Sequence, residues 1–500
     1  MEIAIFLAII VFLLYKLSTK NFGYWKKRKV PFLKPTPIFG NFYECLTFKK
    51  SIGEMLQDMY KQIPDKVFGI WVFNKPHVVI KDPELIKMVL VKDFQYFSDR
   101  TVAADEKADS ISSNILFVLR NPEWKVIRKM MTPAFTSGKI KSMIPLMAEA
   151  GDEMVQYIEK RVNLPTVESK EICAKYATDV ITSCAFGVQG RCFQKEDAKF
   201  RQVGKDMFEP NFTNGVRGIS YFFLQELVYL LKIKFIPPNV SEYLKQIFWS
   251  TINLREKTQQ KRNDVIDIIL KLKQQGDIDG VKFDGDIAVA QAIQFFLAGF
   301  ETTSSTMAFT LYELCLNKSI QTKLRSEIKS VLKKHDEITY EAIQSMKYLD
   351  KVVSETLRKY PVLPFLDRMC NTDYKLPGTD IIIEKGTPVY IPMFGLHYDE
   401  KYWKDPQKYD PERFSDEEIN KRHQYAYIPF GSGPHNCIGE RFGLISTKLG
   451  LVNILNRFEV EKNADTPIPL KYSARSFVLA STIGLPMKFI DSNRRASFAA

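Results

Sequence analysis

The sequence predicts a mainly helical protein with small β-sheets, built as one large domain behind an N-terminal membrane anchor. Three features predict this class: helical spacing of apolar residues from about Trp124 to Lys334, short branched and aromatic runs on either side of that stretch, and an apolar N-terminus. With 500 residues, 45% of them hydrophobic, the chain can bury a large core. Length alone favours about three domains. No repeat and no Ser/Gly linker divides the body, so we expect one.

The N-terminal run Ile3–Leu14 is continuously apolar, and lysines and arginines follow it at positions 16–29. A cleaved signal peptide is the alternative, but it usually carries its positive charge before the apolar run; here Glu2 precedes the run. We therefore expect an uncleaved single-span anchor, with the remainder on the cytosolic side. The predicted organisation is an anchor at 1–20, a basic, proline-containing linker at 21–40, the main domain at 41–492 and a tail at 493–500.

In the first half of the body, residues 67–73 and 77–81 predict a β-hairpin around Asn74-Lys75-Pro76. Asp82-Pro83 then marks a helix start, with Asp as cap and Pro in the first turn, and Asn121-Pro122-Glu123 marks another.

Further along, the longest helix is expected from about Asp286 to Asn317, and another from Ser345 to Lys359, ending before Pro361. Beyond Tyr374 we expect a helix from about Arg441 to Phe458 and two strand pairs. These are 381–383 with 388–391, and 477–479 with 486–489.

The charge balance of 71 Lys and Arg against 58 Asp and Glu leaves a net charge of +13. Such a surface suits anionic partners, but the basic residues are scattered and no RNA-binding, zinc-finger or Walker-type motif accompanies them, so nucleic acid is disfavoured. The seven cysteines contain no Cys-x-x-Cys pair. This disfavours a disulfide framework, a zinc cage, an Fe–S cluster and covalent haem attachment, and it favours a reducing compartment.

One cysteine stands in a distinctive loop, Phe430-Gly-Ser-Gly-Pro-His-Asn-Cys437-Ile-Gly439, just before a predicted helix. Helix amides and the helix dipole are expected to lower the thiol pKa from about 8.5. Gly433 permits positive φ, Gly439 permits close approach of a flat ligand, and Phe430 can shield the sulfur from water. The alternative is a buried structural cysteine, but the spacing Phe-x-x-Gly-x-basic-x-Cys-x-Gly is rare by chance.

With this loop the chain resembles the cytochromes P450 over essentially its whole length. The resemblance implies that Cys437 is the axial ligand of haem iron, within a loop that includes Phe430, Gly433 and Gly439. His435 stands where the family usually has an arginine that contacts a haem propionate. A histidine there can still donate a hydrogen bond, but we expect its charge to depend on pH, since free histidine titrates near pH 6.5.

Glu355 and Arg358 lie at i and i+3 of a predicted helix, which alone indicates no more than an ordinary ion pair. The resemblance adds Arg413, and it implies a structural network of these three residues beneath the haem.

Ala298-Gly299-Phe300-Glu301-Thr302 lies inside the longest predicted helix. Without a resemblance, Ala298 and Gly299 indicate a close helix crossing and Glu301 a solvent-facing residue. Thr302 can hydrogen-bond to a carbonyl one turn earlier, near Ala298. The resemblance implies that the small residues open a groove for dioxygen and that Glu301 and Thr302 relay protons to it.

Trp124 and Arg128 share one helix face, which by spacing alone indicates a surface stack. The resemblance implies instead that both bind haem propionates, together with Arg368.

The resemblance therefore implies a membrane-anchored haem-thiolate monooxygenase of the endoplasmic reticulum, carrying haem b and using O2. Its electrons would come from NADPH through a separate flavoprotein reductase, with cytochrome b5 as a second donor, and its substrates would be lipophilic small molecules. Within the family the chain looks closest to the insect microsomal family 6 and is similar to the vertebrate family 3 of the same clan, which implies detoxification of foreign compounds. An endogenous lipid, hormone or pheromone as substrate, an O2-independent isomerase or dehydratase, and a haem sensor remain alternatives. The expected pocket walls are Phe117, Leu297, Ala298, Leu363, Pro364 and Leu366.

Overall fold

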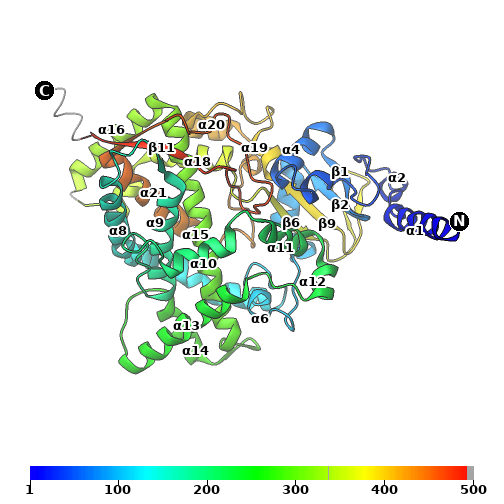
Figure 1. Ribbon diagram of the computed structural model, residues 1–500, viewed down its shortest axis with the longest axis horizontal. Coiled ribbons are helices and arrows are strands. Elements are labelled where there is room, and N and C mark those ends of the chain that lie inside the picture. The colour runs from blue at the N-terminus through cyan, green and yellow to red at the C-terminus, as the bar shows by residue number, and fades with distance from the viewer. Residues whose placement is uncertain (336, 493–500) are drawn as a thin grey trace.

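A computed structural model describes residues 1–335 and 337–492 of the chain; the predicted tail at 493–500 lies outside the described residues. A helical body surrounds the long helix α15 (Gly285–Leu316), and a sheet-rich lobe joins the body on the side from which the N-terminal helix projects (Figure 1). The mainly helical fold with small sheets is confirmed. The longest helix lies within one residue of its predicted bounds at each end.

Among the described residues, the body is formed by ten helices of nine or more residues each. They are α7 (Glu123–Met131), α8 (Ser137–Glu159), α9 (Ser169–Phe186), α10 (Lys199–Phe208), α13 (Pro238–Thr258), α14 (Val265–Gln275), α15, α16 (Lys318–His335), α18 (Lys347–Lys359) and α21 (Glu440–Arg457).

Other helical segments form the N-terminal part and the connections. The α-helices are α1 (Glu2–Thr19), α2 (Tyr24–Lys27), α3 (Tyr43–Leu46), α4 (Ile52–Gln62), α5 (Pro83–Lys87), α6 (Ser110–Ser113), α11 (Phe212–Phe223), α12 (Gln225–Leu231), α17 (Tyr340–Ser345), α19 (Met393–His397) and α20 (Asp416–Lys421). A π-helix, η1 (Met88–Lys92), and the 3-10 helices η2 (Phe94–Tyr96), η3 (Thr132–Phe135), η4 (Pro411–Phe414) and η5 (Gln424–Ala426) complete the set.

Helix α15 is the centre of the core because nearly all of its side chains after Ile287 are buried. Its main partner is α9. At their crossing, a Cβ on Gly299 would come within 2.5 Å of Ile181 Cδ1, so only glycine allows this approach without a shift. The close helix crossing expected at Gly299 is therefore present.

The larger sheet has the order β1-β2-β9-β6, with strands β1 (Val67–Val72), β2 (Lys75–Ile80), β9 (Pro388–Pro392) and β6 (Phe365–Met369). The predicted hairpin is confirmed, with Val67 opposite Ile80. The expected pairing of 381–383 with 388–391 is wrong. Strand β9 lies between β2, to which it is parallel, and β6, while β8 (Ile382–Ile383) pairs with β7 (Tyr374–Lys375). Because β9 is buried, both of its edges need partners, and distant segments supply them.

The second sheet has the order β10-β11-β3, with strands β10 (Phe458–Glu461), β11 (Pro486–Asp491) and β3 (Val167–Glu168). The expected pairing of 477–479 with 486–489 is wrong, because β11 pairs with β10 and β3. Strands β4 (Asp277–Ile278) and β5 (Val281–Lys282) form a small separate hairpin.

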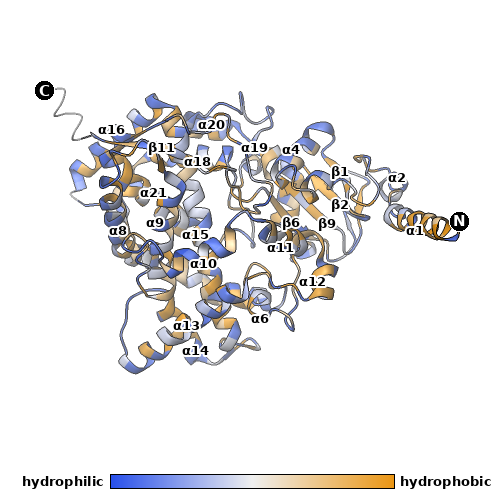
Figure 2. Ribbon diagram, in the orientation of Figure 1, coloured by the Kyte–Doolittle hydropathy of each residue, from blue (hydrophilic) through white to orange (hydrophobic). Residues whose placement is uncertain are grey.

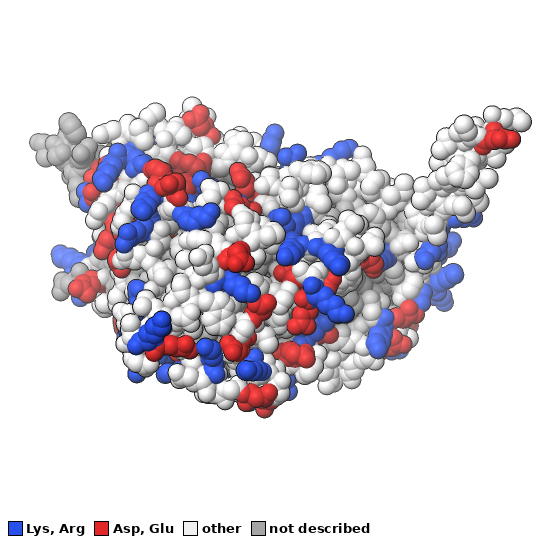
Figure 3. Space-filling view, turned by 60° about the horizontal axis from the view of Figure 1, so that its bottom comes forward, with Lys and Arg blue, Asp and Glu red and all other residues white. Residues whose placement is uncertain are grey.

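Helix α1 is long and apolar enough to cross a membrane, with a mean hydropathy of 2.0, and none of its residues is buried in the body. It extends away from the protein and is apolar around its circumference (Figure 2). This exposure fits a membrane anchor, since a mostly apolar helix of 18 residues approaches the length needed to span a bilayer core. Figure 3 shows charges of both signs interspersed over one face of the body.

The segment expected to be a linker packs against the larger sheet. Trp25 is fully buried, and its indole N–H donates to Ile70 O at 3.1 Å. Trp71 returns a bond from its own indole to Asn21 O at 3.0 Å. The chain after α1 therefore packs on β1.

Candidate active site

The loop before α21 is folded tightly around Cys437. The Cys437 N–H donates to Phe430 O at 2.8 Å, and Asn436 N–H donates to Gly433 O at 3.0 Å. Gly433 has φ +71°, and a Cβ there would lie 1.9 Å from Leu90 O. Backbone conformation and space both require glycine at this position.

Cys437 is exposed although protein atoms surround it, so its side chain borders an internal space and not the outer surface. A Cβ on Gly439 would make only an ordinary contact at 3.6 Å, with Phe135. The expected lowering of the thiol pKa is wrong for the protein chain alone. Burial raises the pKa of Cys437 to about 11 and outweighs the Gly439 amide and the nearby arginines. A thiolate here therefore needs a cation bound to it, as haem iron would be.

Helix α15 borders the same region. Phe295 contacts Phe442 of α21, with ring centroids 5.2 Å apart, and stacks on Phe135, which lies beside Gly439. One turn further along, Ala298 is exposed within an otherwise buried stretch. Ala298 therefore faces an internal opening beside the cysteine loop.

Thr302 follows Ala298 by one helical turn and is half-buried. Its Oγ1 donates to Ala298 O at 2.6 Å, the back-bond expected from the sequence. This bond occupies a carbonyl of the helix and leaves the Thr302 hydroxyl oxygen available as an acceptor on the Ala298 side.

Glu301 does not join Thr302. It is 7% exposed, and its Oε1 lies 2.9 Å from Lys170 Nζ on α9. Lys170 also donates to Ser304 Oγ at 2.6 Å and Ser305 Oγ at 3.1 Å. The solvent-facing alternative for Glu301 is therefore wrong, and the carboxylate is held on the α9 side of the helix. Sequence reasoning missed Lys170, whose spacing on α9 carries no signal for this contact.

Trp124 and Arg128 of α7 reach the cysteine loop. The Trp124 and His435 ring centroids are 3.8 Å apart. Arg128 donates to Asn436 O at 2.9 Å and to Asn436 Oδ1 at 2.8 Å. Trp124 and Arg128 therefore contact the cysteine loop and do not stack on each other at the surface.

Arg368 of β6 and Arg100 lie near the same loop, and both lower the pKa of His435 through their charge. Arg368 is 1% exposed, and its one hydrogen bond to the described part of the chain is to Asp367 O, at 2.7 Å. Arg100, which the sequence did not single out, lies 3.3 Å from Asp367 Oδ1. That carboxylate already accepts bonds from Thr101 N–H at 2.6 Å and Thr101 Oγ1 at 2.8 Å.

Arg100, Arg128 and Arg368 together carry more positive charge than the protein around them neutralises. The Nε atoms of Arg100 and Arg368 are buried and have no hydrogen-bond partner within residues 1–335 and 337–492, and burial lowers the pKa of Arg368 to about 9. Buried unpaired charge and unsatisfied donors are costly, so the cluster fits an anionic group. The two propionates of haem, bound at Cys437, would supply it. The residues present therefore fit haem.

His435 contributes no charge to this cluster. Its Nε2–H donates to Ser98 O at 2.6 Å. Burial and the charges of Arg368, Arg100 and Arg128 lower its pKa to about 2. The expectation that its charge varies with pH near neutrality is therefore wrong, because His435 stays neutral there.

The structure brings Glu355, Arg358 and Arg413 together. Glu355 and Arg358 are fully buried and joined by two bonds of 2.7 and 2.8 Å, and Arg413 Nε lies 3.4 Å from Glu355 Oε1. Arg358 also donates to His397 O at 2.9 Å. The network ties α18 to α19 and η4 without exposing a reactive group.

Three of the expected pocket residues lie near the cysteine loop or the arginines beside it. Ala298 is exposed, Leu366 Cδ1 lies 4.0 Å from the Cβ position of Gly431, and the Phe117 ring lies 4.3 Å from the Arg100 guanidinium.

The other three expected pocket residues are placed differently. Leu297 is buried in the main core, Pro364 packs beside Gly53 of α4, and Leu363 is half-buried.

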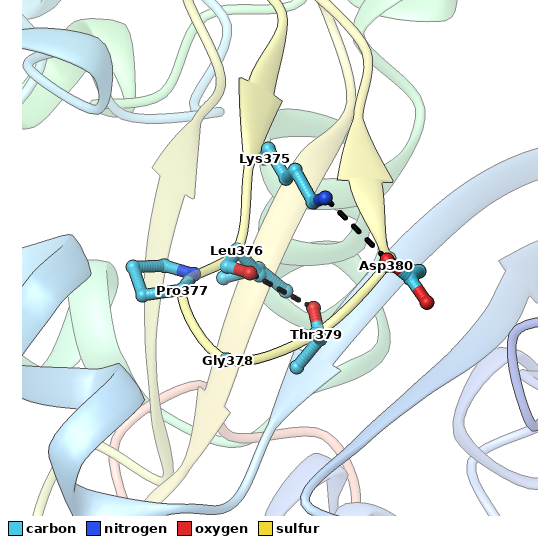
Figure 4. A pocket seen from close by; sticks show the side chains of 6 residues that line it. All are labelled: Lys375, Leu376, Pro377, Gly378, Thr379 and Asp380. Carbon is cyan, nitrogen blue, oxygen red and sulfur yellow. Dashed lines mark hydrogen bonds and ion pairs between the residues drawn. The ribbon is translucent and has the colours of Figure 1, made fainter.

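A separate hollow of 520 Å³ lies at the turn between β7 and β8, far from Cys437 in sequence and lined by none of the expected site residues. Figure 4 shows its lining, with Lys375 reaching toward Asp380 at 3.4 Å and Thr379 bonded to Leu376 O at 3.0 Å. These contacts close a tight turn.

Comparison with known proteins agrees with this site. The family model described as Cytochrome P450 matches residues 30–484. The chain is 44% identical to Cytochrome P450 6k1 of Blattella germanica, over 99% of this chain and 98% of that protein. It is 41% identical to Cytochrome P450 6j1 of the same species, over 98% of each, and 38% identical to Probable cytochrome P450 6a13 of Drosophila melanogaster, over 95% and 96%. The chain therefore belongs to the cytochrome P450 family and is a haem-dependent monooxygenase with relatives in insect family 6.

Proposed function

We propose that this protein is a microsomal monooxygenase that hydroxylates or epoxidises lipophilic foreign compounds, with Cys437 as the axial ligand of haem iron. The observation that carries this assignment is the exposed Cys437 beside three arginines, Arg100, Arg128 and Arg368, near which Asp367 is the one carboxylate identified among the described residues. A thiolate for the iron and cations for the propionates are the two things that haem requires of the chain. The relatives in insect family 6 support detoxification as the role.

Bound haem would supply the redox chemistry that activates dioxygen. Arg100, Arg128 and Arg368 would hold the propionates, and Trp124 would cover the loop through its ring contact with His435. Thr302 donates its own hydroxyl proton to Ala298 O, so its Oγ1 would accept a hydrogen bond from a water molecule in the internal space and position that water to deliver a proton. Glu301, tied to Lys170, links that helix to the half-buried edge of α9 and supplies a second carrier for protons.

Helix α1 would anchor the protein in the endoplasmic reticulum membrane. The basic residues that follow it, including Lys26, Lys27 and Lys29, support a cytosolic position for the body by the positive-inside rule. Electrons would come from NADPH through a separate flavoprotein reductase, with cytochrome b5 as a second donor. A membrane anchor also suits substrates that partition into lipid.

The test uses the full chain in membranes with NADPH and the reductase, against a panel of insecticides, plant toxins, fatty acids and steroids. We expect oxygenated products from the foreign compounds, dependent on both NADPH and O2. Cys437→Ser should abolish these products and the reduced-CO Soret band of a thiolate-bound haem. Survival of that band would overturn the ligand assignment. Turnover of fatty acids or steroids alone would replace detoxification with an endogenous role.

A further inference from the structure

Two glutamines of α15 hold the segment that follows α6. Gln291 is 3% exposed, and its Nε2 donates to Asn114 O at 2.7 Å and to Ile287 O at 3.3 Å. One turn later, Gln294 Oε1 accepts the Phe117 N–H at 3.1 Å. Gln291 Nε2 donates hydrogen bonds to backbone carbonyls, whereas Gln294 Oε1 accepts one from a backbone N–H. One side-chain amide therefore acts as a donor and the other as an acceptor.

The beginning of the same segment is held elsewhere. Asp109 caps α6 by accepting Ser112 N–H at 3.1 Å. Its second oxygen accepts Phe235 N–H at 2.8 Å and the Tyr221 hydroxyl at 3.3 Å, which ties this end to α11 and the chain before α13. The segment from Asp109 to Phe117 is therefore held by hydrogen bonds at both ends, near α11 at its start and by α15 at its end.

The bond to Gln294 holds the backbone from which the Phe117 ring extends. That ring lies 4.3 Å from the Arg100 guanidinium and has its centroid 6.3 Å from that of Phe222 on α11. Gln294 precedes the exposed Ala298 by four residues and so lies on the same face of α15. Phe117 is therefore held where the segment meets the internal space beside Ala298.

We infer that Gln291 and Gln294 form a latch that fixes Phe117 at the edge of the internal space, and that the latch determines which bulky ligands this space accepts. The inference rests on the proposed function, because it treats the space as the substrate site. Both glutamines are positioning residues that act through the backbone of residues 114–117. Loss of either bond would leave a backbone group unpaired and free the segment to move.

Because one amide donates and the other accepts, replacing each glutamine by glutamate should have different effects at the two positions. Gln294→Glu keeps an acceptor for Phe117 N–H, whereas Gln294→Leu removes it. Gln291→Glu removes the donor that Asn114 O needs, and Gln291→Met does so without adding charge to a buried site. Gln202→Leu on α10 is the matched control, since that exposed amide bonds only Asp206, at 2.8 Å.

The first readout is hydrogen exchange of the Phe117 amide in the full-length, haem-loaded enzyme. We expect about tenfold faster exchange in Gln294→Leu, and wild-type exchange in Gln294→Glu and Gln202→Leu, because a lost hydrogen bond is worth about 1 kcal/mol or somewhat more. Wild-type exchange in Gln294→Leu would overturn the latch, whatever the state of the haem.

The second readout is the haem difference spectrum with imidazole, a small ligand, and clotrimazole, a bulky one. We expect Gln294→Leu, Gln291→Glu and Gln291→Met to change the clotrimazole dissociation constant about fivefold or more and that of imidazole less than twofold. Equal changes for both ligands would indicate a general loss of structure and overturn the specificity role. Absence of any haem spectrum in the wild-type protein would instead refute the proposed function, and amide exchange would still decide the latch.

Discussion

Replacing Arg368 with methionine is expected to weaken haem retention more than it weakens the fold. Arg368 is 1% exposed, and burial with the nearby Arg100 lowers its pKa to about 9. The drop from the ordinary arginine value to about 9 corresponds to a cost of about 5 kcal/mol for the charged side chain in the protein alone. For a base with a lowered pKa, this cost is fully present below about pH 9, and so at pH 7.

A bound propionate would offset that cost, and Arg368→Met would leave the propionate without its buried partner. Truncating one member of such a pair typically costs 2 kcal/mol or more. We therefore expect haem to leave the variant about 30-fold faster than wild type or more. The measurement is haem transfer from the full-length holoprotein to excess apomyoglobin, followed in the Soret region.

The control is Arg325→Met on α16, which removes another buried arginine. Arg325 has its own carboxylate, Glu459, at 2.7 Å, and donates to Leu455 O at 3.0 Å. This variant should lower the unfolding temperature and leave haem loss unchanged. Arg368→Lys, which keeps a charge but not the guanidinium fork, should fall between wild type and methionine. Haem loss from Arg368→Met at the wild-type rate would contradict the assigned role of the arginine cluster.

Three further outcomes follow from single contacts. Thr302→Ala should keep haem but divert NADPH electrons into peroxide and water, with Thr302→Ser restoring coupling; an unchanged ratio of product to NADPH would contradict the proton role. Lys170→Met should lower coupling and, by leaving the buried Glu301 carboxylate unpaired, cost about 1–3 kcal/mol of stability in thermal unfolding; Lys170→Arg should restore both, and an unaffected variant would show that the pair is dispensable. Burial raises the pKa of Asp179 to about 6, so the folded state loses stability as pH rises through that value. Asp179→Asn should remove about 1 kcal/mol of this loss between pH 5 and 7; identical pH profiles in thermal unfolding would refute the shift.

Much of the candidate site could be predicted from the sequence because its parts are local. Ten consecutive residues hold Cys437 and its glycines, and one helical turn joins Thr302 to Ala298 or Glu355 to Arg358. Such contacts depend on helix geometry and on what glycine permits, and both can be worked out from spacing. The exposed apolar helix α1 was predictable for the same reason, since a continuous apolar run can be recognised without knowledge of its partners.

The remainder was decided by segments that meet only in the folded chain. Arg100, Lys170 and the two glutamines of α15 have ordinary spacing, and their roles arise from Asp367, Glu301 and the backbone after α6, each more than a hundred residues away. The neutral state of His435 and the raised pKa of Cys437 also depend on burial among distant elements. Hydrogen bonding and desolvation act over a few ångströms in space, so the spacing of residues along the chain does not predict these contacts.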